Sequence, residues 1–342
     1  MTRWLIVTQD FPPAFSGGIA SWAADLAGAL AQTGAPVTVL ARRTGDTREA
    51  DARWPFRVAR MWGRSWNRWQ GWWALGAAWP RLGPDTRVIC ATWPLATQLA
   101  PRLRGARLAV AFHGSDLSRL HAAPPALTAL VPRVRAFLPV SRFLSGRLTD
   151  LCPHAPPAAI HILPMPMAMP PPPTAPRRRS LVVLSRLTAL KGVERAIRIA
   201  HGLGRPLEII GDGPARAALE HAALGDVTFR GRLERDDALA ALEGAAGLLL
   251  LPHPDADGTG AEGFGLCLLE AAARGVPGIG CRTGGVPEAL GPGLLLGDPD
   301  IPDLGAIEAF LSDPAQGAAA RAWACASHGP AAAVAAIEAA MR

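Results

Sequence analysis

The chain has 342 residues, of which 49% are hydrophobic. That length favours two α/β domains, because a single hydrophobic core stops growing beyond roughly 250–300 residues. The five cysteines are odd in number and form no C-x-x-C pair, which argues against a disulfide framework and a zinc site. The N-terminus shows no signal-peptide pattern, and no apolar run reaches membrane-spanning length, so we expect a cytoplasmic protein.

The positive charge is concentrated in the first half of the chain. Residues 1–172 carry a net charge of +11, and residues 173–342 carry −4. Clustered arginine attracts polyanions, so the first half could face anionic lipid, a phosphorylated acceptor or nucleic acid. A second interpretation is a general arginine bias, because the chain has 34 arginines, one lysine and no tyrosine.

Short β-rich runs alternate with helical patterns through the first half of the chain. This alternation predicts right-handed βαβ units and a parallel sheet. The expected strands are 4–8, 37–41, 87–91, 108–112 and 136–140, and the expected helices are 19–33, 95–103 and 142–151.

Proline then interrupts the pattern and predicts a semi-rigid linker over residues 169–179. Beyond it the same alternation restarts. The expected strands are 181–185, 207–210, 227–229 and 248–251, and the expected helices are 193–203, 215–223, 236–245 and 264–274. The alanine-rich segment 315–342 is helical by propensity.

These patterns predict two Rossmann-like, doubly wound parallel-sheet domains that face each other across a cleft. We expect domains over residues 1–168 and 180–325, with a C-terminal helix over 326–342 that either closes the second domain or packs back on the first. Ligands of such sheets bind beyond the carboxyl ends of the strands, so the cleft is the expected site.

The segment from Glu262 to Glu270 is the strongest functional signal. Gly263 and Gly265 let the backbone approach a ligand, and the free N–H groups of a helix start bind anions or polar oxygens. The two glutamates are eight residues apart, so both could lie on one face of a helix. Two acids in an apolar helix are costly to bury without partners, which favours a binding role.

The stretch E-G-F-G-L-C-L-L-E resembles the E-x7-E signature of the retaining family-4 glycosyltransferases, which have the two-domain GT-B fold. Other motifs of the family follow in the same order over residues 1 to about 290. They are Asp10-Phe11-Pro12-Pro13 with Gly17-Gly18, His113-Gly114-Ser115-Asp116, Ser185-Arg186-Leu187 through Lys191-Gly192, Gly211-Asp212-Gly213-Pro214, Phe229-Arg230-Gly231 and Thr283-Gly284-Gly285-Val286-Pro287-Glu288.

The resemblance implies a donor site mainly in the second domain. Arg186 and Lys191 would hold the diphosphate, Glu262 with the Gly263–Gly265 amides would hold the sugar, and Glu270 would accept the ribose hydroxyls. Lys191 is the only lysine in the chain, which suggests that a compact ammonium is needed there. The full expected donor set is Gly17, Gly18, Arg186, Lys191, Gly213, Gly231, Arg232, Glu262, Gly263, Phe264, Gly265, Leu266 and Glu270.

The resemblance also implies how sugar transfer proceeds. No carboxylate stands out as a nucleophile. The resemblance implies front-face displacement, in which a donor phosphate oxygen takes the proton of the acceptor. His113 would act near the anomeric centre together with Arg186, Lys191 and Glu262. No metal and no cofactor is expected, because the two cations can neutralise the diphosphate.

Three motifs also have simpler interpretations. Gly211-Asp212-Gly213 lacks the third glycine of a dinucleotide fingerprint, and the prolines and glycines around His253 favour a loop over a metal site. Eight of the eleven tryptophans lie between Trp54 and Trp93, interleaved with arginine. That segment is part of a hydrophobic core, a membrane contact or an acceptor site. The expected acceptor-side residues are Trp62, Trp66, Trp69 and Asp116. No nucleic-acid motif accompanies it.

The sequence therefore predicts a retaining, metal-independent glycosyltransferase with a UDP- or GDP-sugar donor and a carbohydrate or lipid-linked acceptor, acting in cell-envelope glycan, polysaccharide or glycolipid synthesis. Peripheral binding to the inner face of an anionic membrane is a further expectation. The alternatives are a nucleotide-sugar epimerase of similar fold and a non-catalytic nucleotide-sugar-binding protein.

Overall fold

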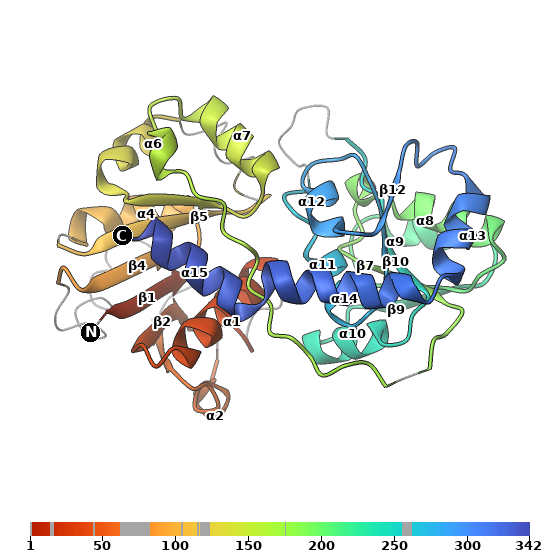
Figure 1. Ribbon diagram of the computed structural model, residues 1–342, viewed down its shortest axis with the longest axis horizontal. Coiled ribbons are helices and arrows are strands. Elements are labelled where there is room, and N and C mark those ends of the chain that lie inside the picture. The colour runs from red at the N-terminus through yellow and green to blue at the C-terminus, as the bar shows by residue number, and fades with distance from the viewer. Residues whose placement is uncertain are drawn as a thin grey trace. The chain divides into compact units, whose positions relative to one another are not determined.

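The computed structural model describes residues 2–13, 17–43, 45–61, 83–103, 105–114, 116, 124–174, 176–254 and 262–342. They form two compact units (Figure 1). The N-terminal unit contains residues 1–168 together with His328–Arg342, and the C-terminal unit contains Met169–Ser327. No helix among the described residues is long and apolar enough to cross a membrane.

The N-terminal unit is built on a six-stranded, all-parallel sheet in the order β3-β2-β1-β4-β5-β6. The strands are β1 Arg3–Thr8, β2 Val37–Arg42, β3 Arg57–Met61, β4 Thr86–Cys90, β5 Arg107–Phe112 and β6 Ala136–Pro139. The helices are α1 Gly18–Gln32, α2 Arg48–Asp51, α4 Trp93–Leu99, α6 Pro124–Leu130, α7 Arg142–Leu151 and α15 Pro330–Ala340, with 3₁₀ turns η1 Ala100–Arg102, η2 Val131–Arg133 and η3 Pro157–Ala159.

The C-terminal unit repeats the same arrangement with the sheet order β12-β11-β10-β7-β8-β9, again all parallel. The strands are β7 Leu181–Leu184, β8 Leu207–Ile210, β9 Val227–Gly231, β10 Gly247–Leu250, β11 Gly278–Cys281 and β12 Leu294–Leu296. The helices are α8 Val193–Gly202, α9 Arg216–His221, α10 Arg235–Leu242, α11 Leu266–Ala273, α12 Val286–Leu290, α13 Leu304–Ser312 and α14 Ala315–His328, with the 3₁₀ turn η4 Ala189–Lys191.

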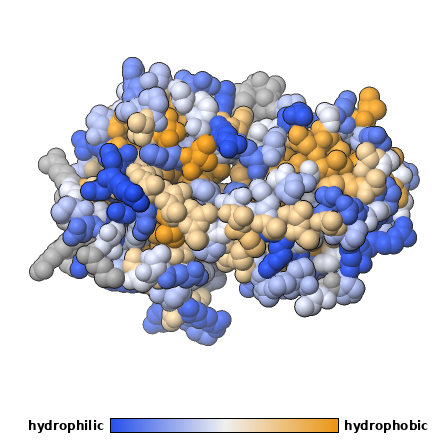
Figure 2. All heavy atoms as spheres, viewed as in Figure 1, coloured by the Kyte–Doolittle hydropathy of each residue, from blue (hydrophilic) through white to orange (hydrophobic). Residues whose placement is uncertain are grey.

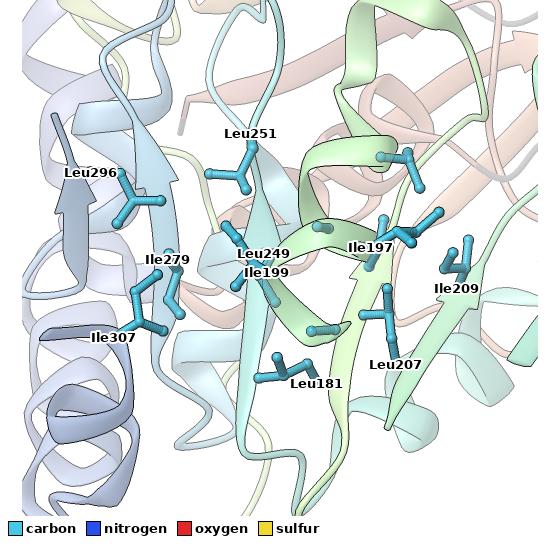
Figure 3. Close-up of a cluster of buried hydrophobic side chains, with 14 of the residues drawn as sticks. Leu181, Ile197, Ile199, Leu207, Ile209, Leu249, Leu251, Ile279, Leu296 and Ile307 are labelled. Carbon is cyan, nitrogen blue, oxygen red and sulfur yellow. The ribbon is translucent and has the colours of Figure 1, made fainter. Parts of the chain in front are cut away.

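Aliphatic side chains from neighbouring strands form the core of the C-terminal unit. Leu181, Leu207, Leu249 and Ile279 are almost completely buried, and residues of α8 and α13 pack against them (Figure 3). Parallel sheets are covered on both faces, so their strands are continuous apolar runs such as Gly-Leu-Leu-Leu in β10. The predicted doubly wound parallel sheets are confirmed.

In each unit the strand order reverses between two neighbouring strands, β1 and β4 in one and β7 and β10 in the other. The chain leaves these two strands in opposite directions, which opens a crevice at their carboxyl ends. The fold therefore places the segments after β7 and β10 at the ligand-binding position of their sheet.

The alanine-rich C-terminal segment, expected to be helical over residues 315–342, forms two helices. Gly329 and Pro330 separate α14 from α15, because proline lacks the N–H that would continue the helical hydrogen bonds. Helix α14 belongs to the C-terminal unit except for His328, while α15 packs along α1 of the N-terminal unit. In Figure 2 the exposed surface of these helices is weakly apolar, as expected for alanine.

Helix α15 should contribute substantially to the stability of the N-terminal unit. Ile337 on its inner face is completely buried. We expect Ile337→Ala to lower the free energy of unfolding of this unit by about 2–4 kcal/mol, because it leaves a cavity against α1. Urea unfolding followed by circular dichroism measures this loss. Ala335→Ser, at an exposed position of the same helix, is the control; equal stabilities of the two variants would contradict the packing role of α15.

Candidate active site

Lys191 and Glu262 form an ion pair at the switch point of the C-terminal sheet. Lys191 ends η4, which follows β7, and Glu262 precedes α11, which follows β10. The Lys191 Nζ donates a hydrogen bond to Glu262 Oε2 at 2.5 Å. The lysine side chain is 29% exposed and the glutamate side chain 16%, so both can be reached by a ligand. The two predicted donor contacts are thus brought together.

Glycines allow two loops to pack closely around Glu262. The Gly285 N–H donates to the Glu262 carbonyl at 2.8 Å, and a Cβ at Gly285 would collide with the Gly263 carbonyl. Gly265 has a φ of +106° and caps α11 directly against Leu250. The Thr283-Gly284-Gly285 motif therefore supports the loop before α11, and these glycines are required by packing whether or not a ligand binds.

Glu262 and Glu270 do not share one helical face, so that expectation was wrong. Helix α11 begins only at Leu266, because Gly265 adopts a left-handed conformation that ends the preceding loop. Glu262 lies in the loop, whereas Glu270 lies within the helix. The two carboxylates consequently have different partners.

Glu270 is a buried carboxylate held by arginine. It is 5% exposed, and its Oε1 accepts a hydrogen bond from Arg235 NH1 at 2.7 Å. Arg274 donates to its backbone carbonyl at 3.0 Å. Burial raises the pKa of Glu270, while the charges of Arg235 and Arg274 oppose that rise. Sequence reasoning missed Arg235, because one arginine among 34 carries no distinctive signal.

The other predicted donor residues of the C-terminal unit lie at the ends of strands or at α11. Arg186 is exposed two residues beyond β7, and Arg232 is exposed directly after β9. Gly213 packs against the Leu187 backbone, and Gly231, with a φ of +68°, ends β9 beside Arg216. Phe264 is buried before α11 and Leu266 is its first residue.

In the N-terminal unit, Gly17 and Gly18 form the exposed start of α1. Gly17 caps the helix in an extended conformation, and a Cβ there would meet no atom of the described structure within 4 Å. A helix of 15 residues that begins with exposed glycines offers its first N–H groups to an anion.

His113 follows β5 and is 93% buried, with 7% of its surface exposed. Its backbone N–H donates to Asp116 Oδ2 at 3.0 Å, and its ring lies edge-on to Trp22, with 5.0 Å between the ring centroids. Burial lowers the pKa of His113 to about 4, although a hydrogen bond to the Ala91 backbone opposes this. The Nε2 atom has no hydrogen-bond partner among the residues that the structure describes.

Asp116 and three tryptophans are the residues expected on the acceptor side. Asp116 is fully buried and binds the His113 backbone, so within the described structure its role is to hold the histidine loop. Trp62, Trp66 and Trp69 lie outside the described residues. Trp22, which contacts His113, was missed, because it lies in α1, outside the tryptophan-rich segment 54–93.

The two six-stranded parallel sheets match the fold of GT-B glycosyltransferase structures. Solved structures with the same fold include Anabaena HepE in complex with UDP and glucose, with a TM-score of 0.75, 15% identity and 99% of both chains covered. TarM of S. aureus superposes with a TM-score of 0.76 at 10% identity over 100% of both chains.

Sequence relatives identify the family. The profile described as "Glycosyltransferase Family 4" matches residues 16–167, and that described as "Glycosyl transferases group 1" matches 178–313. A GDP-mannose-dependent alpha-(1-6)-phosphatidylinositol monomannoside mannosyltransferase of Mycolicibacterium smegmatis is 30% identical, with 94% of this chain and 93% of that protein covered. A related Corynebacterium glutamicum mannosyltransferase is 35% identical over 40% of each chain. The chain belongs to glycosyltransferase family 4.

The Arg235–Glu270 contact should make stability depend on pH. A carboxyl whose pKa is raised on folding contributes stability that is present below its ordinary pKa of 4.5 and is lost as pH rises through the folded value. Arg235→Met removes the cation that opposes this loss. We expect it to cost roughly 1–3 kcal/mol at pH 8 and less at pH 5, as measured by urea unfolding. Arg235→Met/Glu270→Gln should show no such difference; equal losses at both pH values would contradict the assignment.

The His113 ring should be neutral at pH 7. Because burial lowers its pKa to about 4, its neutral form contributes stability that is present above the ordinary value of 6.5 and is lost as pH falls towards 4. NMR titration of histidine-labelled protein should give a His113 midpoint near pH 4, with the signal assigned from His113→Asn. A midpoint near 6.5 would exclude a desolvated imidazole.

Proposed function

We propose that this protein is a retaining, metal-independent glycosyltransferase that transfers a sugar from a UDP- or GDP-sugar. The observation that carries the proposal is the Lys191–Glu262 pair at the switch point of the C-terminal sheet. The Mycolicibacterium smegmatis relative, covered along 93% of its length, is named as GDP-mannose-dependent, and the HepE structure contains UDP and glucose. GDP-mannose and UDP-glucose are therefore the first two donors to test.

On the donor side, the ion pair supplies a cation for the diphosphate and a carboxylate for the sugar hydroxyls. The diphosphate attracts Lys191 and the exposed Arg186, because charge-assisted hydrogen bonds to phosphate are strong. Once Lys191 turns to the phosphates, the Glu262 carboxylate is available to accept sugar hydroxyls. Glu270, oriented by Arg235, is proposed to accept the ribose hydroxyls.

The transfer step is proposed to occur on one face of the sugar. The bond between the anomeric carbon and the phosphate oxygen breaks, the acceptor oxygen bonds to the same face, and the acceptor proton passes to a phosphate oxygen. Lys191 and Arg186 stabilise the negative charge on the leaving diphosphate. The neutral His113, with Nε2 unpartnered in the described structure, orients groups at the anomeric centre.

The acceptor is proposed to bind in the N-terminal unit near His113. A carbohydrate or lipid-linked acceptor of the cell envelope is supported by the names of the relatives, which act on phosphatidylinositol mannosides. The net charge of +11 on residues 1–172 supports peripheral binding to the inner face of an anionic membrane. No cofactor is included in the proposal, because the nucleotide sugar is itself a substrate.

Removal of the Lys191 ammonium tests the donor site. GDP-mannose or UDP-glucose should raise the melting temperature of the wild-type protein, since a ligand that binds only the folded state stabilises it. We expect Lys191→Ala to weaken donor or transition-state binding by about 1.5–3 kcal/mol, because a charge-assisted contact is lost. Lys191→Arg, which keeps the charge, should retain part of the binding.

The result that would contradict this role is equally direct. If Lys191→Ala binds the stabilising nucleotide sugar as tightly as the wild type and transfers sugar at the same rate, then Lys191 does not hold the diphosphate. Product analysis by NMR of the new anomeric bond tests retention separately.

A further inference from the structure

Arg195 is a buried arginine close to the donor site that the transfer mechanism does not use. It lies in the first turn of α8, four residues after Lys191, and only 6% of its side chain is exposed. A fully charged guanidinium is not buried without partners, because the loss of hydration is costly. Its contacts therefore show what it holds in place.

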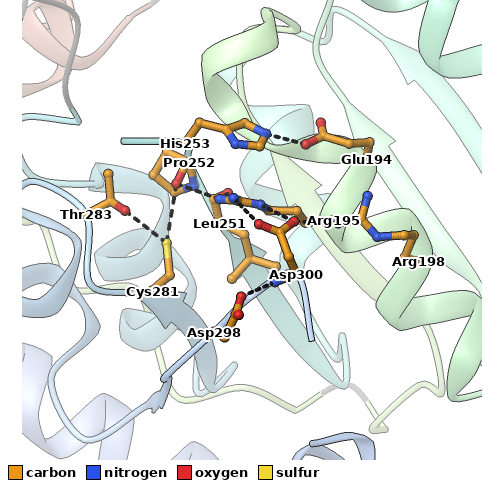
Figure 4. A network of polar contacts seen from close by, with 10 residues as sticks. All are labelled: Glu194, Arg195, Arg198, Leu251, Pro252, His253, Cys281, Thr283, Asp298 and Asp300. Carbon is orange, nitrogen blue, oxygen red and sulfur yellow. Dashed lines mark hydrogen bonds and ion pairs between the residues drawn. The ribbon is translucent and has the colours of Figure 1, made fainter. Parts of the chain in front are cut away.

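The Arg195 guanidinium forms four hydrogen bonds in two directions (Figure 4). Its Nε and NH2 atoms donate to the two carboxylate oxygens of Asp300 at 3.0 and 2.6 Å. Its NH1 atom donates to the carbonyls of Leu251 and Pro252 at 3.2 and 3.1 Å. These carbonyls lie directly after β10, where the chain leaves the sheet.

The segment that carries Lys191 rests against the same backbone. The His253 N–H donates to the Leu190 carbonyl at 2.9 Å. Gly192 has a φ of +60°, and a Cβ there would collide with the Leu251 carbonyl oxygen. The Pro252 carbonyl also accepts a hydrogen bond from the thiol of Cys281, the last residue of β11, at 3.5 Å. The exits of β7 and β10 thus meet at the two carbonyls that Arg195 binds.

We infer that Arg195 is a positioning residue of the donor site, which holds the Lys191 segment against the exit of β10 through the carbonyls of Leu251 and Pro252. Asp300 fixes the guanidinium from the opposite side. Lysine cannot replace it, because a single ammonium lacks the planar fork that reaches a carboxylate and two carbonyls together. The ligand class is the nucleotide-diphosphate sugar, so the inference rests on the proposed function.

The same unit contains a matched control. Arg205 forms a bidentate ion pair with Glu308 at 2.9 and 2.7 Å and also donates to a backbone carbonyl, that of Arg179, at 3.3 Å. Its side chain is 11% exposed. Arg205 follows α8, and its side-chain hydrogen bonds in the described structure go to Glu308 of α13 and to Arg179, not to the segments that carry Lys191 and Glu262. Arg205→Lys therefore removes a similar interaction elsewhere.

The experiment compares Arg195→Lys with Arg205→Lys by isothermal titration with GDP-mannose and UDP-glucose. Partial unfolding lowers the binding stoichiometry of either variant, whereas displacement of the donor contacts raises Kd. We expect Arg195→Lys to raise the Kd of the donor that binds the wild type by roughly tenfold or more, since small misplacements of binding groups have large effects. Arg205→Lys should stay within about twofold of the wild type.

The remaining outcomes each support or overturn the inference. A Kd for Arg195→Lys within twofold of that for Arg205→Lys overturns the inference while leaving the proposed function intact. If Arg195→Lys does not fold, Asp300→Asn decides: it keeps the arginine but weakens its anchor, so a raised Kd supports the inference and an unchanged Kd overturns it. Failure of the wild type to bind either nucleotide sugar overturns the proposed function, and the inference with it.

Discussion

Much of the proposed chemistry depends on one ion pair between neighbouring strand exits. Lys191 and Glu262 follow β7 and β10, the two strands between which the order of the sheet reverses. At 2.5 Å the two charges satisfy each other. A nucleotide sugar carries groups that can bind both, negative phosphates for the ammonium and hydroxyl donors for the carboxylate. In the proposed donor complex, one set of charge-assisted contacts is exchanged for another, and neither charge is left unpaired.

Arginine carries much of the internal polar bonding that holds the loops of both units. Arg60 of β3 binds Asp51 and also donates to the carbonyls of Phe11 and Pro12, in the loop before α1. Arg321 of α14 donates to the carbonyls of Ala273 and Pro170. Arg195 likewise donates to two carbonyls, those of Leu251 and Pro252 after β10. A guanidinium suits this work because its donors are fixed in one plane. The single lysine, Lys191, differs from these arginines, because in the proposed function its partner changes from Glu262 to the donor phosphates.

The sequence was sufficient for the fold wherever apolar periodicity was strong. The runs around β1, β5, β7 and β10 are continuous and apolar, so their parallel strands could be predicted. Strand β11 was missed because Gly-Ile-Gly-Cys has a single β-branched residue, Ile279, between two glycines, and glycine is depleted in strands. The two glycines allow Val286 and Leu290 to pack closely on the strand. Motif order located Lys191 and Glu262, but their direct contact depends on long-range packing. Arg235 and Arg195 could not be found, since their roles depend on which carbonyls and carboxylates the fold brings to them.

The return of the chain end to the first unit has a consequence for how the protein is made. Helix α15 covers α1, although more than 290 residues separate the two in sequence. During synthesis the side of α1 that α15 covers therefore stays uncovered until α15 has left the ribosome. The N-terminal unit cannot complete its own core early, as an uninterrupted domain can, and must wait for the whole C-terminal unit to be translated. A fragment that ends at the proline-rich segment would keep that surface exposed permanently, which makes it a poor candidate for independent folding.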